Sequence, residues 1–568
     1  MNDTLLYALV GNYNHPLLVH KKHNKERSFY FTIKGKGKNW ETRFEFDELF
    51  PFSLPKVWLL EDEYIGRIPH VNIEGLLCIN ESDSLITNYK APEDLIGTII
   101  KSAVDLLEFG SLKINYTELT DEYEGFIEPI SYHIPGNFIG GDNPQKVYIK
   151  ICRSNNVNQA NEKPFFVLGD GMNLPEHFSN FSRTNSFQTI KSIYIPLEFP
   201  MLPPQGSNGL TMEYIYELFS HTSSHHSKVV GQIINKIKPS KVFYILFGIP
   251  RSNGTRSLIL FQLKNVTKIT HPFIEKSMNW SLSSFLIDRH HKEYLLERGG
   301  ADFNLSNNRV AIIGCGSVGS EVALMLAKAG VGHLIFIDFD SLGIDNIYRH
   351  RLGGEYLNYE PDSKSGQVLK YYKSEALKFY LRSSLPHIET DALTVPVEKI
   401  IGGKELKNVD VIISAIGSPA NNLILNKKFK ELGYHKIIYC WNEALSAGGH
   451  ALAVDLDSTC YECQFWNEGG FSMISPFNLV SPGQHLTKNL TGCAGVFTPF
   501  SYLDSSQTAM ITARLCLEVL TSDTINKIVS WKNNNEPGIQ LTERYYEMEL
   551  LEERAYTKSS YCETCSHG

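Results

Sequence analysis

The chain has 568 residues, of which 42% are hydrophobic and 20% charged, and this globular composition predicts roughly three or four folded units. Its formal net charge of -8 argues against a nucleic-acid-binding protein, and the lack of any run near ~18 apolar residues argues against a membrane span. The amino terminus has no secretory signal and the ten cysteines are spread along the chain, which predicts a reducing, cytoplasmic location.

Residues 1–125 predict a small α+β domain. The runs Ser28–Ile33 and Lys56–Leu60 are rich in β-branched and aromatic residues, and proline turns separate them. A helical pattern of apolar residues follows from Pro92 to Leu107. Short strands followed by one long helix are typical of an α+β fold.

Cys78 follows a short polar turn in this domain. The sequence runs from Phe50-Pro51-Phe52 through His70-Val71-Asn72 to Cys78. This stretch resembles the core of ubiquitin-conjugating enzymes, in which a proline-rich strand pair precedes a His-Pro-Asn turn and the acceptor cysteine. The resemblance implies that Cys78 accepts a thioester, that His70 and Asn72 form the turn, and that the Asn72 amide stabilises an oxyanion. Valine replaces the proline of that turn, and a cysteine in this setting is otherwise a packing residue.

Residues 126–280 predict a central mixed α/β domain. The apolar runs in this region alternate with polar Asn, Ser and Gly clusters, and they lie at Lys146–Ile151, Ser192–Pro196, Lys241–Phe247 and Ser257–Phe261. No catalytic constellation is visible among them. We therefore expect this domain to link or dock the two ends of the chain.

Residues 281–568 predict a Rossmann-like α/β domain with a nucleotide site. Gly314, Gly316 and Gly319 follow the apolar strand Val310–Ile313 and open a helix over Glu321–Lys328. Glycines at this place let the backbone approach a phosphate, and the helix amino terminus supplies N–H donors. A second strand, from His333, ends in Asp338, the carboxylate expected to bind ribose hydroxyls.

The polar segment after Asp338 separates two interpretations of this site. A dinucleotide oxidoreductase is the ordinary one for such a fold. However, Asp340, Asn346, Arg349 and then Lys364 follow in order, and such a segment can surround a triphosphate and stabilise the charge of departing pyrophosphate. A nicotinamide needs no such group of cations.

These residues resemble the ubiquitin-activating superfamily, including the ThiF- and MoeB-type bacterial adenylyltransferases, over roughly residues 285–530. The resemblance implies bound ATP and Mg²⁺, ribose binding by Asp338, and phosphate contacts from Asn346, Arg349 and Lys364. It further implies a homodimer and one arginine reaching the site from before the first strand, for which Arg289 and Arg298 are alternatives.

One position departs from this pattern. The family has a magnesium-binding acid after its fourth strand, whereas this chain has Gly417 in the stretch after Val409-Asp410. Either Asp340 or another acid holds the metal, or the ATP chemistry is impaired. The second alternative would make the domain a nucleotide-binding scaffold.

The other cysteines predict a metal site and a second acyl carrier. Two CxxC pairs, Cys460 with Cys463 and Cys562 with Cys565, can supply four thiolates to one structural Zn²⁺, and two disulfides are the alternative. Cys493 lies on a Gly- and Pro-bearing loop before a helix expected to start near Gln507, where the adenylating family has its thioester or persulfide cysteine. A buried structural cysteine is the alternative there.

The whole order of domains resembles the fused activating-and-conjugating enzymes of bacterial CBASS (cyclic-oligonucleotide) anti-phage defence. This resemblance implies that the C-terminal carboxylate of a cGAS-like cyclic-nucleotide synthase is adenylated, passes from Cys493 to Cys78, and joins an amine of an acceptor protein. Three other functions stay open: activation of a ubiquitin-like protein, activation of a sulfur carrier with a persulfide on Cys493, and a non-catalytic scaffold.

Overall fold

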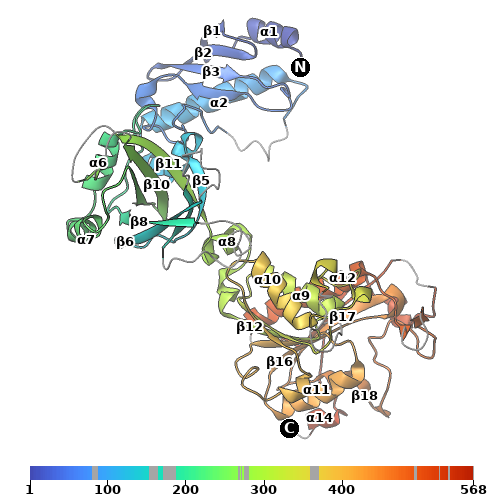
Figure 1. Cartoon of the computed structure of the whole chain (residues 1–568). Coiled ribbons are helices and arrows are strands. Elements are labelled where there is room, and N and C mark those ends of the chain that lie inside the picture. Colours follow the sequence, from blue (N-terminus) through green and yellow to red (C-terminus); the bar gives the residue numbers. More distant parts are fainter. Residues whose placement is uncertain are drawn as a thin grey trace. The chain divides into compact units, whose positions relative to one another are not determined.

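The computed structural model describes residues 1–79, 87–152, 164–169, 187–265, 269, 271–273, 280–357, 370–490, 496–522, 525–534 and 538–566. These residues form two compact units (Figure 1). The first unit ends at His291 and the second begins at Lys292.

The first unit begins with a four-stranded antiparallel sheet and a long helix packed on it. The strands lie in the order β1-β2-β3-β4. Alternate residues of β2 are buried, and α2 presents an apolar face to them, so sheet and helix share one core. The elements are α1 (Asp3–Asn12), β1 (Leu18–His23), β2 (Ser28–Lys34), β3 (Asn39–Glu45), β4 (Lys56–Leu59), α2 (Pro92–Ser111), α3 (Tyr116–Asp121) and α4 (Tyr123–Ile127). The predicted strands and helix of this α+β region are confirmed.

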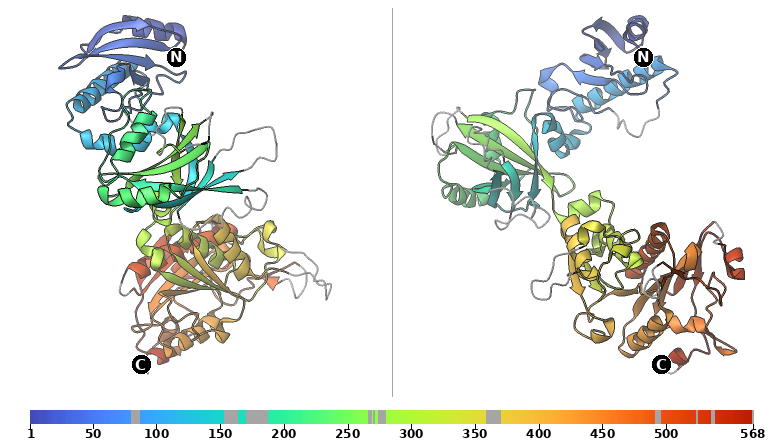
Figure 2. Two further views of the ribbon diagram at one scale, coloured as in Figure 1. Left: turned by 60° about the vertical axis from the view of Figure 1, so that its left-hand side comes forward. Right: turned by 45° about the vertical axis from the view of Figure 1, so that its right-hand side comes forward.

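The middle of the chain is a closed barrel, with the strand order β10-β11-β5-β7-β6-β8-β9. One apolar cluster fills the barrel, and a second lies outside its wall beneath two helices, which are green in Figure 2. The elements are β5 (Tyr132–Asn137), β6 (Gln145–Cys152), β7 (Pro164–Leu168), β8 (Phe187–Pro196), α6 (Met212–Ser220), α7 (Ser224–Ile234), β9 (Val242–Pro250), β10 (Arg256–Asn265) and β11 (Trp280–Arg289).

The barrel differs from the mixed α/β domain expected for residues 126–280. The four strands predicted there correspond to β6, β8, β9 and β10. Closure depends on β11, which pairs with β5 in parallel from Phe285 and Tyr132 onward, and so distant a pairing leaves no local pattern. Because β11 runs to Arg289, the barrel also extends beyond the expected boundary at residue 280.

The second unit is an eight-stranded sheet with helices on both faces. Five strands, in the order β14-β13-β12-β15-β16, are parallel, and β17, β22 and β23 continue the sheet in antiparallel pairs. Helices α9, α10 and α12 cover one face, and α11 and α14 cover the other (Figure 1). This is the α/β fold expected from the sequence, with a larger antiparallel part.

The bounds of this unit follow the sequence patterns closely. The strands are β12 (Arg309–Ile313), β13 (His333–Ile337), β14 (Glu389–Leu393), β15 (Val411–Ser414), β16 (Lys436–Asn442), β17 (Gly448–Asp455), β18 (Trp466–Asn467), β19 (Gly470–Phe471), β20 (Lys488–Asn489), β21 (Val496–Phe497), β22 (Lys527–Lys532) and β23 (Leu551–Ala555). The α-helices are α8 (Lys292–Arg298), α9 (Ser317–Ala329), α10 (Lys373–Ser384), α11 (Pro419–Glu431), α12 (Tyr502–Thr521), α13 (Glu543–Glu547) and α14 (Glu563–Ser566).

Candidate active sites

The glycine loop between β12 and α9 lies at the carboxyl edge of the sheet. Strand order reverses beside β12, since β13 and β14 lie on one side of it and β15 and β16 on the other. Ligands of open α/β sheets bind in the crevice at such a point. Gly314 has a φ of +88°, and a Cβ there would lie 3.0 Å from the Ala415 carbonyl oxygen. The loop after β12 thus closely approaches the loop after β15.

The next two glycines have different roles. A Cβ at Gly319 would lie 1.9 Å from the Gly314 carbonyl oxygen, so α9 packs closer to the loop than a side chain permits. Nothing lies within 4 Å of the position that a Cβ would take at Gly316. This open space borders the first turn of α9, where N–H groups and the helix dipole favour a phosphate.

Two side chains hold this loop. The Asp338 carboxylate accepts hydrogen bonds from the N–H groups of Cys315, at 2.7 Å, and Asp340, at 2.8 Å. His350 Nε2 donates to the Cys315 carbonyl oxygen at 2.6 Å, while its Nδ1 accepts from the Leu352 N–H at 3.0 Å. Burial lowers the pKa of His350 to about 4, so a neutral ring makes these contacts at pH 7. Burial raises the pKa of Asp338.

Of the three residues predicted to contact phosphate, the structure describes Asn346 and Arg349. Asn346 Oδ1 accepts the Gly343 N–H at 3.0 Å, which stabilises the turn before Arg349. The Arg349 guanidinium carbon lies 5.1 Å from the centre of the Phe500 ring. Lys364 lies outside the described residues.

Lys373 is a cation at this edge that the sequence analysis missed. It is the first residue of α10, its side chain is 13% exposed, and its Nζ lies 3.1 Å from Asp340 Oδ2. Lys364 is the first lysine after the arginine segment, and Lys373 lies nine residues beyond it. Lys373 stands at the start of a helical pattern in the sequence, and this position is the feature from which its place at the site could have been predicted.

Asp340 is the described carboxylate that best fits a magnesium ion here. Gly417 occupies the turn after β15 with a φ of +71°, so it offers no side-chain ligand. Asp338 already accepts two backbone hydrogen bonds. The Asp340 side chain is 59% exposed. Mg²⁺ commonly takes one or two carboxylates together with phosphate oxygens. Asp340 could supply one of them in exchange for its ion pair with Lys373.

Cys493 lies outside the described residues, but both flanks of its loop are described. On the amino-terminal flank, β20 pairs with β21 of the carboxyl-terminal flank, through Lys488 with Phe497 and Asn489 with Val496. Helix α12 begins at Tyr502, earlier than the expected start near Gln507, because Ser501 and Asp504 form a capping box.

Cys78 ends a tight hairpin in the first unit. Its N–H donates to the His70 carbonyl oxygen at 2.8 Å, and Val71 bridges Leu77 between them. Asn72 Oδ1 accepts two N–H groups across the turn, from Glu74 at 3.0 Å and Leu76 at 2.9 Å. The side-chain oxygen of Asn72, Oδ1, is thus occupied by hydrogen bonds within the turn. The side-chain nitrogen, Nδ2, is the polar atom of this amide that is left to contact an oxyanion.

Two glutamates contact the ring nitrogens of His70 in this hairpin. His70 Nδ1 lies 2.7 Å from Glu122 Oε1, and Nε2 lies 3.0 Å from Glu118 Oε2. The His70 N–H also donates to Glu122, at 3.1 Å. The hydrogen bond to Glu122 raises the pKa of His70. His70 is therefore a positioning residue that joins the hairpin to the segment of α3 and α4.

The environment of Cys78 disfavours the thiolate form of its side chain. The residue is solvent-accessible, yet surrounding protein atoms partly desolvate its sulfur. This desolvation raises the pKa of the Cys78 thiol, and the carboxylates of Glu122 and Glu128 raise it further.

Iodoacetamide labelling should reveal this shift. Because a raised pKa leaves less thiolate, Cys78 in the folded chain should react more slowly at pH 7.5 than Cys78 in urea, and its rate should keep rising at higher pH. Glu128→Gln should speed labelling roughly two- to fivefold by removing one negative charge. A Glu128→Gln rate profile that superimposes on the wild-type profile would contradict this electrostatic effect.

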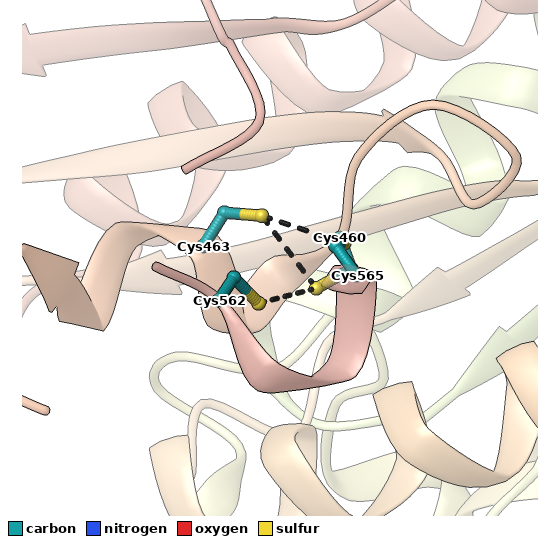
Figure 3. A group of neighbouring side chains, drawn as sticks. All are labelled: Cys460, Cys463, Cys562 and Cys565. Carbon is teal, nitrogen blue, oxygen red and sulfur yellow. Dashed lines mark hydrogen bonds between the residues drawn. The ribbon is translucent and has the colours of Figure 1, made fainter. Parts of the chain in front are cut away.

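The four cysteines of the two CxxC pairs meet in one buried cluster (Figure 3). Sulfur atoms lie 3.8 Å apart between Cys460 and Cys463, 3.7 Å between Cys460 and Cys562, and 3.6 Å between Cys463 and Cys565. Four thiolates at ~2.3 Å from Zn²⁺ in a tetrahedron are about 3.8 Å apart, so the cluster fits that ion. The separations are far longer than the ~2 Å of a disulfide bond, so the disulfide alternative does not fit.

Neighbouring groups support negative charge on this cluster. Lys430 Nζ lies 3.8 Å from the Cys565 sulfur and donates to the Leu456 carbonyl oxygen at 3.0 Å. The Tyr556 hydroxyl donates to the Cys460 carbonyl oxygen at 3.0 Å. The residues therefore suit a structural metal with a closed shell of four protein ligands.

The two arginines left as alternatives have different surroundings. Arg289 belongs to the first unit, where its guanidinium contacts both carboxylate oxygens of Glu124, at 2.9 and 2.5 Å, and the Arg256 carbonyl oxygen at 3.2 Å. Arg298 is an exposed residue in the last turn of α8, in the second unit. Arg289 is thus occupied with the barrel, which favours Arg298 for any contact with a nucleotide.

Cys315, Cys440 and Cys516 are buried. Among the described residues, none of the helices is both long and apolar enough to cross a membrane.

Most of the second unit matches a known protein family. Residues 294–552 match the ThiF family. A protein of Escherichia coli (strain TW11681) named ATP-dependent ubiquitin transferase-like protein Cap2 is 23% identical over 517 residues, which cover 83% of this chain and 84% of that protein. A protein of the same name from Pseudomonas aeruginosa (strain BWHPSA011 / Pa011) is 29% identical over 227 residues, or 38% of this chain and 36% of that protein.

Among solved structures, E. coli MccB in a crystal structure with MccA-N7isoASN is similar to 48% of this chain, over 69% of its own length. The sequence identity in that alignment is 17% and the TM-score is 0.32.

Proposed function

We propose, from the match of residues 294–552 to the ThiF family, that the chain is an ATP-dependent enzyme that activates a protein C-terminus and conjugates it to an amine. The observation that carries the proposal is the glycine loop at the reversal of strand order, with open space at Gly316 before the first turn of α9. The extent of the match to the E. coli ubiquitin transferase-like protein supports a function that uses both units.

The first step is adenylation. The N–H groups after Gly314 and the first turn of α9 bind phosphate oxygens, and Asp338 binds the ribose hydroxyls. The carboxylate of the activated protein attacks the α-phosphorus of ATP, forming a mixed anhydride as the bond to pyrophosphate breaks. Arg349 and a lysine, Lys364 or Lys373, stabilise the negative charge that develops. Asp340 would hold Mg²⁺, which neutralises part of the phosphate charge when bound.

Three acyl transfers follow. The Cys493 thiolate attacks the acyl carbon of the adenylate and AMP leaves, which gives a thioester. The Cys78 thiolate then attacks that thioester and the Cys493 thiolate leaves. At Cys78, the Asn72 amide nitrogen stabilises the oxyanion of the tetrahedral intermediate. An amine, most simply of a lysine side chain, finally displaces Cys78 and forms an amide.

The partner that we propose for activation is a cGAS-like cyclic-nucleotide synthase, and the biological setting is bacterial anti-phage defence in the cytoplasm. The conjugating half, with the Cys78 hairpin, supplies the acceptor step that a sulfur-carrier activator does not need. A homodimer would allow Arg298 of one copy to reach the nucleotide of another.

A thioester assay tests this function. The purified chain is incubated with Mg-ATP and the synthase encoded nearest to it, and adducts are analysed on non-reducing gels and by intact mass. We expect a thiol-sensitive adduct on wild type, an adduct trapped on Cys493 in Cys78→Ala, and none in Cys493→Ala. A Cys516→Ala variant, which removes a buried cysteine of α12, is the matched control and should behave as wild type.

Other outcomes would select other functions. An adduct unaffected by Cys78→Ala, or a persulfide mass on Cys493, would contradict the relay and favour sulfur-carrier activation. A chain that binds Mg-ATP and forms no adduct with the synthase or with a small ubiquitin-like protein would favour a scaffold.

A further inference from the structure

Three parts of the nucleotide site meet at the start of α12. They are the first turn of α9, the segment Arg349–Arg351, and the segment Pro499–Tyr502 that follows the Cys493 loop. The last of these has no role in the adenylation chemistry above. Its contacts nevertheless connect it to both of the others.

Tyr502 makes the contact to α9. Its hydroxyl donates to Glu321 Oε1 at 2.8 Å, and Glu321 is 3% exposed. A buried carboxylate that loses such a partner is left desolvated and unpaired, which raises the free energy of the folded chain. The folded chain therefore strongly favours this hydrogen bond. The bond therefore fixes the start of α12 to the helix whose amino terminus faces the phosphate site.

Arg351 makes a second connection within the same group. Its N–H donates to Ser320 Oγ on α9 at 3.2 Å, and its Nε donates to the Tyr380 hydroxyl on α10 at 2.9 Å. Arg351 therefore connects α9 with α10.

Arg349, two residues earlier, contacts the same segment from its other end. Its guanidinium carbon lies 5.1 Å from the centre of the Phe500 ring, a cation–π distance. A phosphate that attracts Arg349 must compete with this contact. Any movement of Arg349 therefore changes an interaction of the segment that carries Tyr502.

The segment is also held from the side of β16. The Leu445 N–H donates to the Pro499 carbonyl oxygen at 3.0 Å, and Ser446 Oγ donates to Asp504 Oδ2 at 2.5 Å. Leu445 and Ser446 have φ values of +53° and +63°, which are unfavourable for side chains other than glycine. Strained backbone of this kind persists where surrounding contacts enforce it, and it concentrates at functional sites.

We propose that Tyr502 and Glu321 are positioning residues that couple nucleotide binding to the placement of the segment after the Cys493 loop. The inference rests on the proposed function, since it assumes that ATP binds at the glycine loop. Arg349 responds to phosphate, Phe500 transmits the change to the segment, and the bond between Tyr502 and Glu321 holds the segment against α9. Such coupling is reciprocal, so the placement of the segment also alters the affinity for ATP.

Hydrogen–deuterium exchange of the full chain, with and without Mg-ATP, tests this coupling. In wild type, Mg-ATP should change the exchange of the peptide that spans Val496–Asp504. Tyr502→Phe, which removes only a hydroxyl group, should reduce this ATP-dependent change roughly threefold or more, and Glu321→Gln should act in the same direction. Tyr380→Phe is the matched control, because it removes a tyrosine hydroxyl of α10 that contacts Arg351 but not the Pro499–Tyr502 segment, and it should retain the wild-type change.

A nucleotide titration of each variant separates the possible failures. If wild type does not bind Mg-ATP, the result contradicts both the proposed function and the proposed coupling. If wild type binds Mg-ATP and the exchange of the peptide is unchanged, or if Tyr502→Phe retains the wild-type change, only the coupling is overturned. Equal losses in Tyr502→Phe and Tyr380→Phe would also overturn it, since they would indicate a general loosening around Arg351.

Discussion

Replacing Gly316 by alanine should leave the fold intact and weaken ATP binding roughly a hundredfold, the order expected when one preorganised phosphate contact is lost. Gly316 has a φ of -78°, which alanine adopts without strain, and open space surrounds the position of the new Cβ. That space is where a phosphate must approach the backbone before the first turn of α9. The methyl group therefore interferes with the ligand rather than with the protein.

Gly319→Ala gives the contrasting result. Its Cβ would lie 1.9 Å from the Gly314 carbonyl oxygen, so α9 must move away from the loop. We expect about 2–4 kcal/mol of destabilisation, as for other overpacked sites. Thermal unfolding and a fluorescent-nucleotide titration distinguish the two variants.

Gly231→Ala serves as the matched control for both variants. Gly231 lies in α7 of the first unit, with nothing within 4 Å of the new Cβ. It should change neither stability nor ATP affinity by much. Wild-type ATP affinity in Gly316→Ala would contradict the placement of a phosphate at this loop.

Loss of zinc should have the largest effect on stability. The chain should carry one Zn²⁺, measured by mass spectrometry of metals, and structural zinc binding contributes about 10 kcal/mol or more to folding. Four buried thiols left without metal would face one another at 3.6 to 3.8 Å with no strong partner. We therefore expect a strong chelator, or Cys460→Ser, to lower the melting temperature of the second unit markedly.

Cys440→Ala is the control for that experiment. Cys440 is also buried in the second unit but lies outside the cluster, so its replacement leaves a small cavity and retains the zinc. Exchange of peptides near α14 and η10 (Tyr461–Phe465) should increase only in Cys460→Ser and the chelated chain. A metal-free chain with the melting temperature of wild type would contradict a structural zinc site.

Patterns within short stretches of sequence determined many of the helices and strands of this protein. The run of apolar residues before Gly314, the spacing of the glycines and the acid at Asp338 predicted β12, α9 and β13, because strand, turn and helix signals are local. The same reasoning found β2, β4 and α2 around the Cys78 hairpin. Hydrogen bonds along the backbone and one apolar face are enough to specify such elements.

Only the tertiary structure decided how distant residues meet. It closed the barrel through β5 and β11, and it set the distance of 3.7 Å between the sulfur atoms of Cys460 and Cys562, whose meeting the two CxxC motifs had predicted. It also placed Lys373 beside Asp340 and Tyr502 beside Glu321, contacts that no spacing predicts. The physical reason is that such contacts depend on the packing of whole layers, whose geometry is set by the combined burial of many apolar side chains rather than by neighbours along the chain.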